Sequence, residues 1–296
     1  MKEILVKSVL NKKKKRDSWF LDDYTLNPYE GCSFNCQYCY IRGSKYGENM
    51  EHALAAKINA PEVLDRQLAF RVKKAQYGMI ALASATDPYI AAEARYGLTG
   101  RLLSIIHKHR FPLLMITKSE MITRDIEILG KIRTDGIHAP EFRGRLPGVV
   151  ISFSLSTLDE EVAATLEPGA PPPHKRLETM RTLKEAGFLV GVNSIPTLPF
   201  ISDSVEALER MILAAKAHGA DYMHIGGLTL FGNQPADSKE LYYKFLERKF
   251  PGLVPEYRKL YRIFFAPPKK YFDELERKAD VLCRKHNMRR TILDPA

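Results

Sequence analysis

Three of the four cysteines of this 296-residue chain lie within eight residues of one another. They are Cys32, Cys36 and Cys39, spaced C-x3-C-x2-C, whereas Cys283 stands alone. Cysteine thiolates are the ligands that zinc, copper(I) and iron–sulfur clusters prefer. Because cysteine is scarce elsewhere in the chain, we interpret this group as a metal centre rather than as three buried free thiols.

The number of available ligands separates two kinds of metal centre. A structural zinc ion takes four protein ligands, and the nearest further Cys or His is His52, 13 residues beyond Cys39. Three thiolates suit a 4Fe-4S cluster whose fourth iron stays open for an exogenous ligand. The spacing therefore favours a 4Fe-4S cluster over zinc.

Short apolar segments alternate with amphipathic segments through the middle of the chain. Segments typical of strands buried on both faces are 24–28, 79–83, 113–117, 149–154, 189–194 and 222–226. Helical segments between them are 61–76, 99–109, 124–133, 174–186 and 203–218. Asp203 followed by Glu206 predicts a capping box at the start of the last of these helices. Gly187 and Gly219 follow predicted helix ends, where a left-handed residue favours glycine.

This alternation predicts repeated right-handed βαβ units around a parallel sheet. About six units favour an α/β fold of the partial (β/α)6 TIM-type barrel class, and a doubly wound open sheet is the alternative. In both folds the catalytic and ligand-binding residues lie at the carboxyl ends of the strands. We expect a basic N-terminal extension (1–19), the barrel (20–236) and a basic, Tyr-rich helical C-terminal extension (237–296).

The net charge of +10 is concentrated near the C-terminus, where residues 239–296 hold fifteen Lys and Arg against eight Asp and Glu. Five tyrosines are interleaved there: Tyr242, Tyr243, Tyr257, Tyr261 and Tyr271. Cations and rings together can bind phosphates and bases of nucleic acid. An amphipathic helix packed on the body by its aromatic face has the same pattern, and charge alone favours this second interpretation.

Composition excludes several classes of protein. With 45% hydrophobic and 27% charged residues the chain is ordinary for a globular protein, and four cysteines are too few for a disulfide-stapled scaffold. No apolar run approaches the ~20 residues of a membrane span. The basic run 12–16 follows a short apolar stretch, the reverse of a secretory signal. No P-loop, dinucleotide motif or Ser-His-Asp order is present. We expect a cytoplasmic protein.

The cysteine motif, with the aromatic Tyr38 before its third cysteine and a (β/α)6 pattern around it, resembles the radical S-adenosylmethionine (SAM) superfamily. Within that superfamily the chain is similar to the spore photoproduct lyase-like branch at 27–39, 83–89, 116–119 and 151–154. The resemblance covers most of residues 20–230. It implies a 4Fe-4S cluster on the three cysteines, with SAM bound to the open iron. It also implies reductive cleavage of SAM to a 5′-deoxyadenosyl radical, with an electron donor such as a flavodoxin or ferredoxin.

The same resemblance implies which residues bind SAM. Tyr38 is expected against the adenine, and Lys118 beside the SAM carboxylate as a charge-assisted partner. The remaining candidates close successive strands: Ser84, Thr86, Asp87, Ser152, Ser154 and Asn193. Ser84, Thr86 and Asp87 are expected at the amino group, and Ser152 or Ser154 at the carboxylate or ribose. Any one of them alone would also suit a strand-ending turn or a backbone-bonded hydroxyl, but at successive strand ends they favour a cofactor site.

One position departs from the branch. Photoproduct lyases carry a cysteine after the second strand, assigned to hydrogen-atom return, and Ala85 occupies that position here. Cys283 lies in the helix-like stretch 274–286 and is expected to be a packing residue. Tyr40 and Tyr89 flank the expected site and are candidate hydrogen-atom relays. His224 is either a core histidine, the favoured interpretation, or a residue that touches substrate.

The sequence therefore predicts a lyase-like radical SAM enzyme that abstracts hydrogen from an unidentified substrate. One interpretation is DNA repair, with the basic tail binding phosphates. The alternatives are an enzyme of a peptide or small metabolite, and a non-catalytic metal- or nucleic-acid-binding module. Cofactor residues at successive strand ends favour an enzyme, because a binding module needs no such arrangement.

Overall fold

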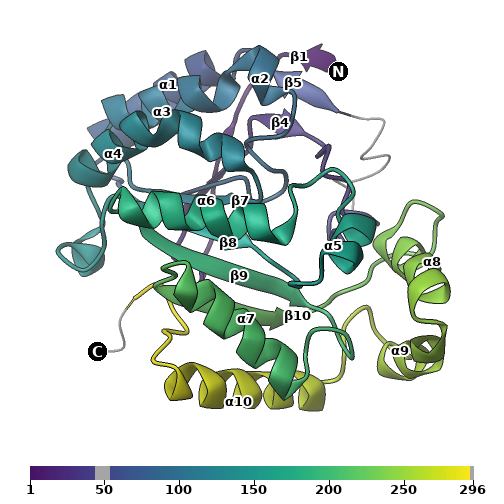
Figure 1. The fold of residues 1–296 in the computed structure, drawn as a ribbon. Coiled ribbons are helices and arrows are strands. Elements are labelled where there is room, and N and C mark those ends of the chain that lie inside the picture. The colour runs from purple at the N-terminus through teal and green to yellow at the C-terminus, as the bar shows by residue number, and fades with distance from the viewer. Residues whose placement is uncertain (44–53, 294–296) are drawn as a thin grey trace.

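Six parallel strands, arranged in the order in which they occur in the chain, form the centre of the molecule. A computed structural model describes residues 1–43 and 54–293 (Figure 1). The main sheet has the order β10-β9-β8-β7-β6-β3-β2, with only β2 antiparallel. The bounds are β2 Leu10–Lys12, β3 Tyr24–Leu26, β6 Ile80–Leu82, β7 Leu113–Thr117, β8 Val149–Ser154, β9 Leu189–Thr197 and β10 Tyr222–Gly227. A doubly wound sheet reverses its strand order, so this sequential order identifies the partial (β/α)6 barrel.

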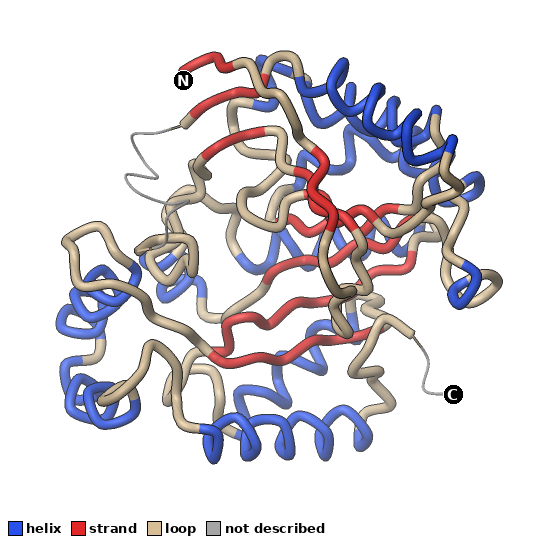
Figure 2. Tube along the Cα trace, turned by 180° about the vertical axis from the view of Figure 1, so that it is seen from behind, coloured by secondary structure: helices blue, strands red, loops and turns tan. Residues whose placement is uncertain are grey.

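Helices cover the outer face of this sheet (Figure 1), and the view from behind shows the strands side by side (Figure 2). The long helices are α1 Ala60–Lys73, α3 Leu98–Lys108, α4 Ile126–Asp135, α6 Pro173–Glu185, α7 Val205–Ala217 and α10 Lys269–Lys285. The others are α2 Glu93–Tyr96, α5 Glu160–Leu166, α8 Ser238–Lys249 and α9 Val254–Leu260. A small sheet joins β1 (Lys2–Ile4), β5 (Ala55–Lys57) and β4 (Tyr29–Glu30). Among the described residues, no helix combines the length and apolar character needed to cross a membrane.

The predicted elements agree with the structure apart from their ends. The strands predicted at 113–117 and 149–154 have the predicted bounds, and Gly187 and Gly219 both have φ of +84°. The predicted Asp203 capping box is wrong. Ser204 caps α7 by accepting from the backbone N of Ala207 at 3.1 Å, because the Asp203 carboxylate is already used by the backbone N of Phe200 and the hydroxyl of Tyr271.

The tyrosines of the C-terminal segment pack against the barrel. Tyr242 and Tyr257 are fully buried and their hydroxyls lie 2.9 Å apart, and Tyr257 also donates to the backbone oxygen of Pro199. Tyr261 donates to the backbone oxygen of Leu228 at 2.9 Å. Three of the five tyrosines thus pack as the packed-helix interpretation expects, whereas Tyr243 and Tyr271 are half-buried. The three predicted domain boundaries stay a prediction.

Candidate active site at the carboxyl edge of the barrel

Polar side chains from four neighbouring strands lie level with one another at the carboxyl edge. Ser154 pairs with Asn193, and Asn193 pairs with His224. The β7–β8 register runs to Thr117, so the next residue, Lys118, is level with Ser154. We call this set the polar row: Lys118, Ser154, Asn193 and His224.

The polar row faces the inside of the barrel. Its neighbours along the strands, Phe153, Val192 and Ile225, lie in the core on the helix side, and side chains alternate along a strand. One layer deeper, the buried hydroxyls of Ser152 and Tyr222 hydrogen-bond to each other. Below them lies an apolar plug that includes Met79, Ala81, Leu114 and Val150. The structure therefore brings Ser154 and Asn193 to the edge, and places Ser152 beneath them with its hydroxyl already bonded.

Asp87 holds the turns after β6 and β7 together. Its buried carboxylate accepts from Thr117 Oγ1 at 2.9 Å, the backbone N of Lys118 at 2.8 Å and the backbone N of Tyr89 at 2.9 Å. Burial raises the pKa of Asp87 although these donors oppose the rise. Thr86 donates to the backbone oxygen of Asp87 at 3.1 Å. Both side chains thus stabilise the turn, as the strand-ending alternative predicts.

The loop after β6 meets the residues that precede the cysteines. Asn27 Oδ1 accepts from the backbone N of Ala85 at 3.0 Å, and its amide lies 3.4 Å from Ser84 Oγ. Tyr40, 54% exposed, donates to the backbone oxygen of Ser84. Tyr40 therefore joins this loop to the cysteine segment. Sequence reasoning assigned no role to Asn27.

Tyr89 is placed elsewhere. It is fully buried in the core on the helix side, and its hydroxyl donates to Asp125 at 3.0 Å. The prediction that it flanks the site as a hydrogen-atom relay is wrong, because the turn held by Asp87 directs it away from the barrel interior.

The segment that contains the three cysteines, residues 32–39, is called the cysteine loop, and it folds through backbone turns. The backbone oxygens of Cys32, Cys36 and Cys39 accept from residues three further along, at 3.3, 3.2 and 3.0 Å. Cys36 is buried, the other two are partly buried, and all are free thiols. Burial raises the pKa of Cys32 to about 12 and also raises those of Cys36 and Cys39, while the Lys118 charge lowers the latter two.

These thiols fit the donor set of a cluster. The charges of Cys32 and Cys39 both act on Cys36, and that of Cys39 acts on Cys32, so the three are close. Metal binding deprotonates such thiols. Within 1–43 and 54–293 no group of three or more His, Cys, Asp or Glu side chains is arranged to hold a single metal ion. His52 lies outside the described residues. Cys283 is buried in the main hydrophobic core, as expected of a packing residue.

Two residues of the site have partners that the sequence did not reveal. Tyr38 is buried, and its hydroxyl is bonded to Glu167 and, at 2.9 Å, to Ser156. His224 is 1% exposed; its Nδ1 lies 3.1 Å from Asn193 Oδ1, and its Nε2 has no hydrogen-bond partner in the structure. Burial lowers the pKa of His224 to about 4, and Trp19 stacks on its ring at 5.4 Å. A neutral imidazole therefore presents an unused nitrogen within the barrel.

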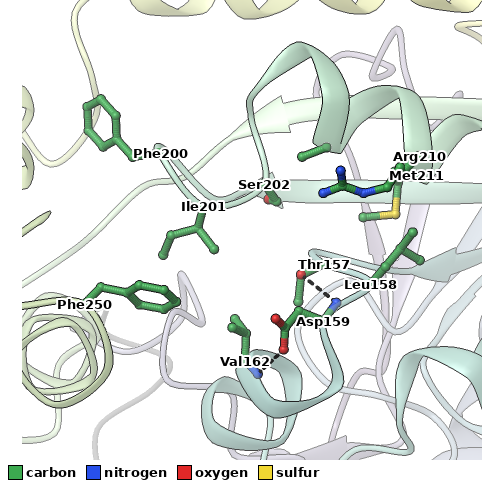
Figure 3. A pocket seen from close by; sticks show the side chains of 11 residues that line it. Thr157, Leu158, Asp159, Val162, Phe200, Ile201, Ser202, Arg210, Met211 and Phe250 are labelled. Atoms are coloured by element: carbon green, nitrogen blue, oxygen red, sulfur yellow. Dashed lines mark hydrogen bonds between the residues drawn. The ribbon is translucent and has the colours of Figure 1, made fainter.

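A cavity of about 400 Å³ has no residue of the polar row in its lining (Figure 3). Residues from the loop before α5, the loop before α7 and α7 itself line it, together with Phe250. Thr157 Oγ1 accepts from the backbone N of Asp159, and Asp159 caps α5 at the backbone N of Val162. Ser202 accepts from the backbone N of Leu198. Thr157, Asp159 and Ser202 therefore already stabilise the two loops.

Solved structures share this fold. A cysteine-to-serine mutant of spore photoproduct lyase superposes with a TM-score of 0.64 at 14% identity, covering 93% of this chain and 78% of that one. A second photoproduct lyase mutant, with bound AdoMet and dinucleoside spore photoproduct, gives a TM-score of 0.62 at 15% identity and the same coverage. At these identities the likeness shows the barrel fold.

Sequence relatives match between three fifths and nearly all of the chain. Uncharacterized protein Rv2578c of Mycobacterium tuberculosis is 30% identical over 292 residues, which is 97% of this chain and 81% of the relative. Uncharacterized protein MJ0683 of Methanocaldococcus jannaschii is 26% identical over 184 residues, 61% and 62% of the two chains. The family model of the Radical SAM superfamily matches residues 26–212. The chain thus belongs to the radical SAM superfamily.

Proposed function

We propose that this chain is a lyase-like radical SAM enzyme that carries a 4Fe-4S cluster on Cys32, Cys36 and Cys39. The observation that carries the proposal is the placement of three free thiols beside Lys118, whose charge acts on two of them, at the edge where the polar row faces inward. When bound, the cluster and SAM supply a one-electron cleavage that yields a 5′-deoxyadenosyl radical for hydrogen abstraction.

The chain's own residues would bind and orient SAM. Lys118 brings a cation that can pair with the SAM carboxylate. Ser154 and Asn193, one and two strands away, offer a hydroxyl and an amide to the same carboxylate or to the ribose. The Ser152–Tyr222 bond and the apolar plug close the barrel beneath them and keep water from that side. A flavodoxin or ferredoxin would supply the electron, and a cytoplasmic location stays a prediction.

For the substrate we propose nucleic acid, acted on in a photoproduct lyase-like reaction. The shared fold and the surplus of cations in residues 239–296 support this choice. Because Ala85 replaces the cysteine of the branch, another group must return the hydrogen atom. Tyr40 is our candidate, since it is exposed and bonded to the loop that contains Ala85.

The reaction can be tested by anaerobic reconstitution with iron and sulfide, reduction with dithionite and measurement of 5′-deoxyadenosine released from SAM. Cys36→Ala should abolish release. The matched Cys283→Ala variant, which alters a cysteine of the hydrophobic core, should retain it. Equal release from wild type and Cys36→Ala, or tightly held zinc with no release, would refute the proposal.

The substrate can be tested in the same assay. Added DNA should raise the rate of release, and its binding should weaken steeply with salt because phosphate contacts release counterions. If DNA neither binds nor changes the rate, a peptide or small metabolite becomes the substrate class.

A further inference from the structure

A buried carboxylate joins the cysteine loop to the barrel. We propose that Glu167 is a positioning residue: it holds the cysteine loop against the carboxyl edge and sets the charge beside the cluster. The second part of this proposal, on the charge beside the cluster, rests on the proposed function. Glu167 follows α5, which lies between the sheet and α8 in Figure 1, and is 3% exposed.

The Glu167 side chain has partners on three elements. One oxygen accepts from the hydroxyl of Tyr38, which stands between the second and third cysteines. The other oxygen accepts from Arg176 of α6. Lys118, at the end of β7, brings its Nζ to 3.9 Å from the oxygen that Tyr38 uses. The carboxylate therefore accepts hydrogen bonds from the cysteine loop and α6 and forms an ion pair with the polar row.

The backbone around Glu167 follows the cysteine loop closely. The backbone N of Gln37 donates to the oxygen of Leu166 at 2.7 Å, and that of Gly169 donates to the oxygen of Phe34 at 3.1 Å. A Cβ at Gly169 would lie 2.2 Å from the backbone oxygen of Ser33, so only glycine permits this approach. We call residues 166–169 the clamp segment, because both its backbone and its carboxylate bind the cysteine loop.

Arg176 connects the clamp segment to the polar row. It is almost fully buried, donates to the backbone oxygen of Ser154 at 3.1 Å, and donates to that of Pro171 at 2.8 Å. A displacement of Glu167 would therefore loosen Tyr38 on one side and the end of β8 on the other. This continuity argues for a positioning role rather than a local structural bond.

Charge gives the second part of the inference. A buried carboxylate is costly unless it is paired, and here it faces two cations, Lys118 and Arg176. Its negative charge opposes a further negative charge on the neighbouring cluster. Removal of that charge should make the cluster easier to reduce, which shifts its midpoint potential to a more positive value.

The loop-holding role can be tested without any cluster. In the apo-protein, alkylation of each cysteine by iodoacetamide is followed by mass spectrometry in wild type, Glu167→Ala and Glu167→Gln. Loss of a hydrogen bond to a charged group should speed alkylation of Cys36 and Cys39 by roughly tenfold or more in Glu167→Ala, and less in Glu167→Gln. Glu161→Ala is the matched control, because Glu161 is a glutamate of α5 with its side chain 79% exposed.

The Cys283 rate reports whether the variants remain folded, since that thiol lies in the main core. If Cys283 also becomes reactive in Glu167→Ala, Tyr38→Phe removes the same bond from the other side and should produce the same acceleration at Cys36 and Cys39. Unchanged rates at these two thiols in Tyr38→Phe and Glu167→Gln would overturn the loop-holding role.

The charge role is tested on the reconstituted protein by a potential titration monitored by electron paramagnetic resonance. Glu167→Gln should shift the midpoint potential positive, and Glu161→Gln should leave it unchanged. An unchanged or more negative potential in Glu167→Gln would overturn the charge role. If wild type takes up no cluster, the proposed function fails together with the charge role, and the alkylation rates decide the loop-holding role separately.

Discussion

At the carboxyl edge of the barrel, His224 keeps a ring nitrogen with no hydrogen-bond partner in the structure, whereas the buried tyrosines of the C-terminal segment have bonded hydroxyls. Both regions attract attention in the sequence through their residue types. The two regions differ in which polar groups keep no hydrogen-bond partner after folding. The hydroxyls of Tyr242 and Tyr257 hydrogen-bond to each other, whereas the polar row faces the inside of the barrel. The comparison therefore rests on two features at this edge: the unpartnered His224 nitrogen and three clustered free thiols.

The largest effect is expected where the clamp segment touches the cysteine loop. Gly169→Ala would place a methyl group 2.2 Å from the backbone oxygen of Ser33, so the loop must move. Iron bound after reconstitution should fall from about four per chain to a small fraction of that. Gly252→Ala is the control, because a Cβ there meets nothing within 4 Å. Full iron content in Gly169→Ala would show that the loop does not need this contact.

The polar row gives the next prediction. Lys118→Met removes the cation beside the cysteines but keeps an apolar side chain of similar length. Loss of a charged hydrogen bond of roughly 1.5–3 kcal/mol should weaken SAM binding by about 10- to 100-fold. Equilibrium binding of SAM to the reconstituted protein measures this, with exposed Lys175→Met as control. Equal affinity in the two variants would remove Lys118 from the cofactor site.

The buried imidazole predicts a pH dependence of stability. The pKa of His224 is about 4 in the folded protein against 6.5 as its ordinary value. Between these values the unfolded state binds more protons, so the free energy of unfolding falls as pH falls. From pH 8 to pH 5 this contribution amounts to about 2 kcal/mol.

From pH 8 to pH 5, the free energy of unfolding of His224→Phe should therefore fall by about 2 kcal/mol less than that of wild type, as measured by urea unfolding. Burial also lowers the pKa of His138, but that residue is present in both proteins and drops out of the difference. Parallel stability curves for the two proteins would mean that His224 is not held neutral.

The smallest effect belongs to the C-terminal segment. Tyr257→Phe removes a hydroxyl bonded to Tyr242 and to the backbone oxygen of Pro199, and should lower the free energy of unfolding by about 1–2 kcal/mol. DNA binding should not change, because the ring is buried. Tyr243→Phe, at a half-buried position, is the control for stability. A loss of DNA binding without a loss of stability would show that these tyrosines contribute to DNA binding rather than to packing.

Local pattern was enough to predict the barrel. The strands at 113–117 and 149–154 were predictable to the residue because each is a short apolar run between helical segments. The N-cap of α7 was predicted one residue too early, since Asp203 and Ser204 are both good capping residues and only the tertiary partners of Asp203 decide between them.

The partners of the site could not be read from the sequence. Tyr38 and Glu167 are 129 residues apart in the chain, and Asn193 and His224 are 31 apart. No local period links such pairs, and Glu167 follows a seven-residue helix that sequence reasoning did not predict. Tyr89 is the opposite case. Its place in the sequence suggested a hydrogen-atom relay, but the turn at Asp87 directs its hydroxyl to Asp125 instead.

The central claim is that the cysteine loop and the polar row form one SAM site. Its most direct test is the electron paramagnetic resonance spectrum of the dithionite-reduced, reconstituted protein with and without SAM. We expect SAM to change the spectrum of the cluster, and expect Lys118→Met to require a correspondingly higher SAM concentration for the same change. A reduced cluster whose spectrum is the same at saturating SAM would contradict the claim.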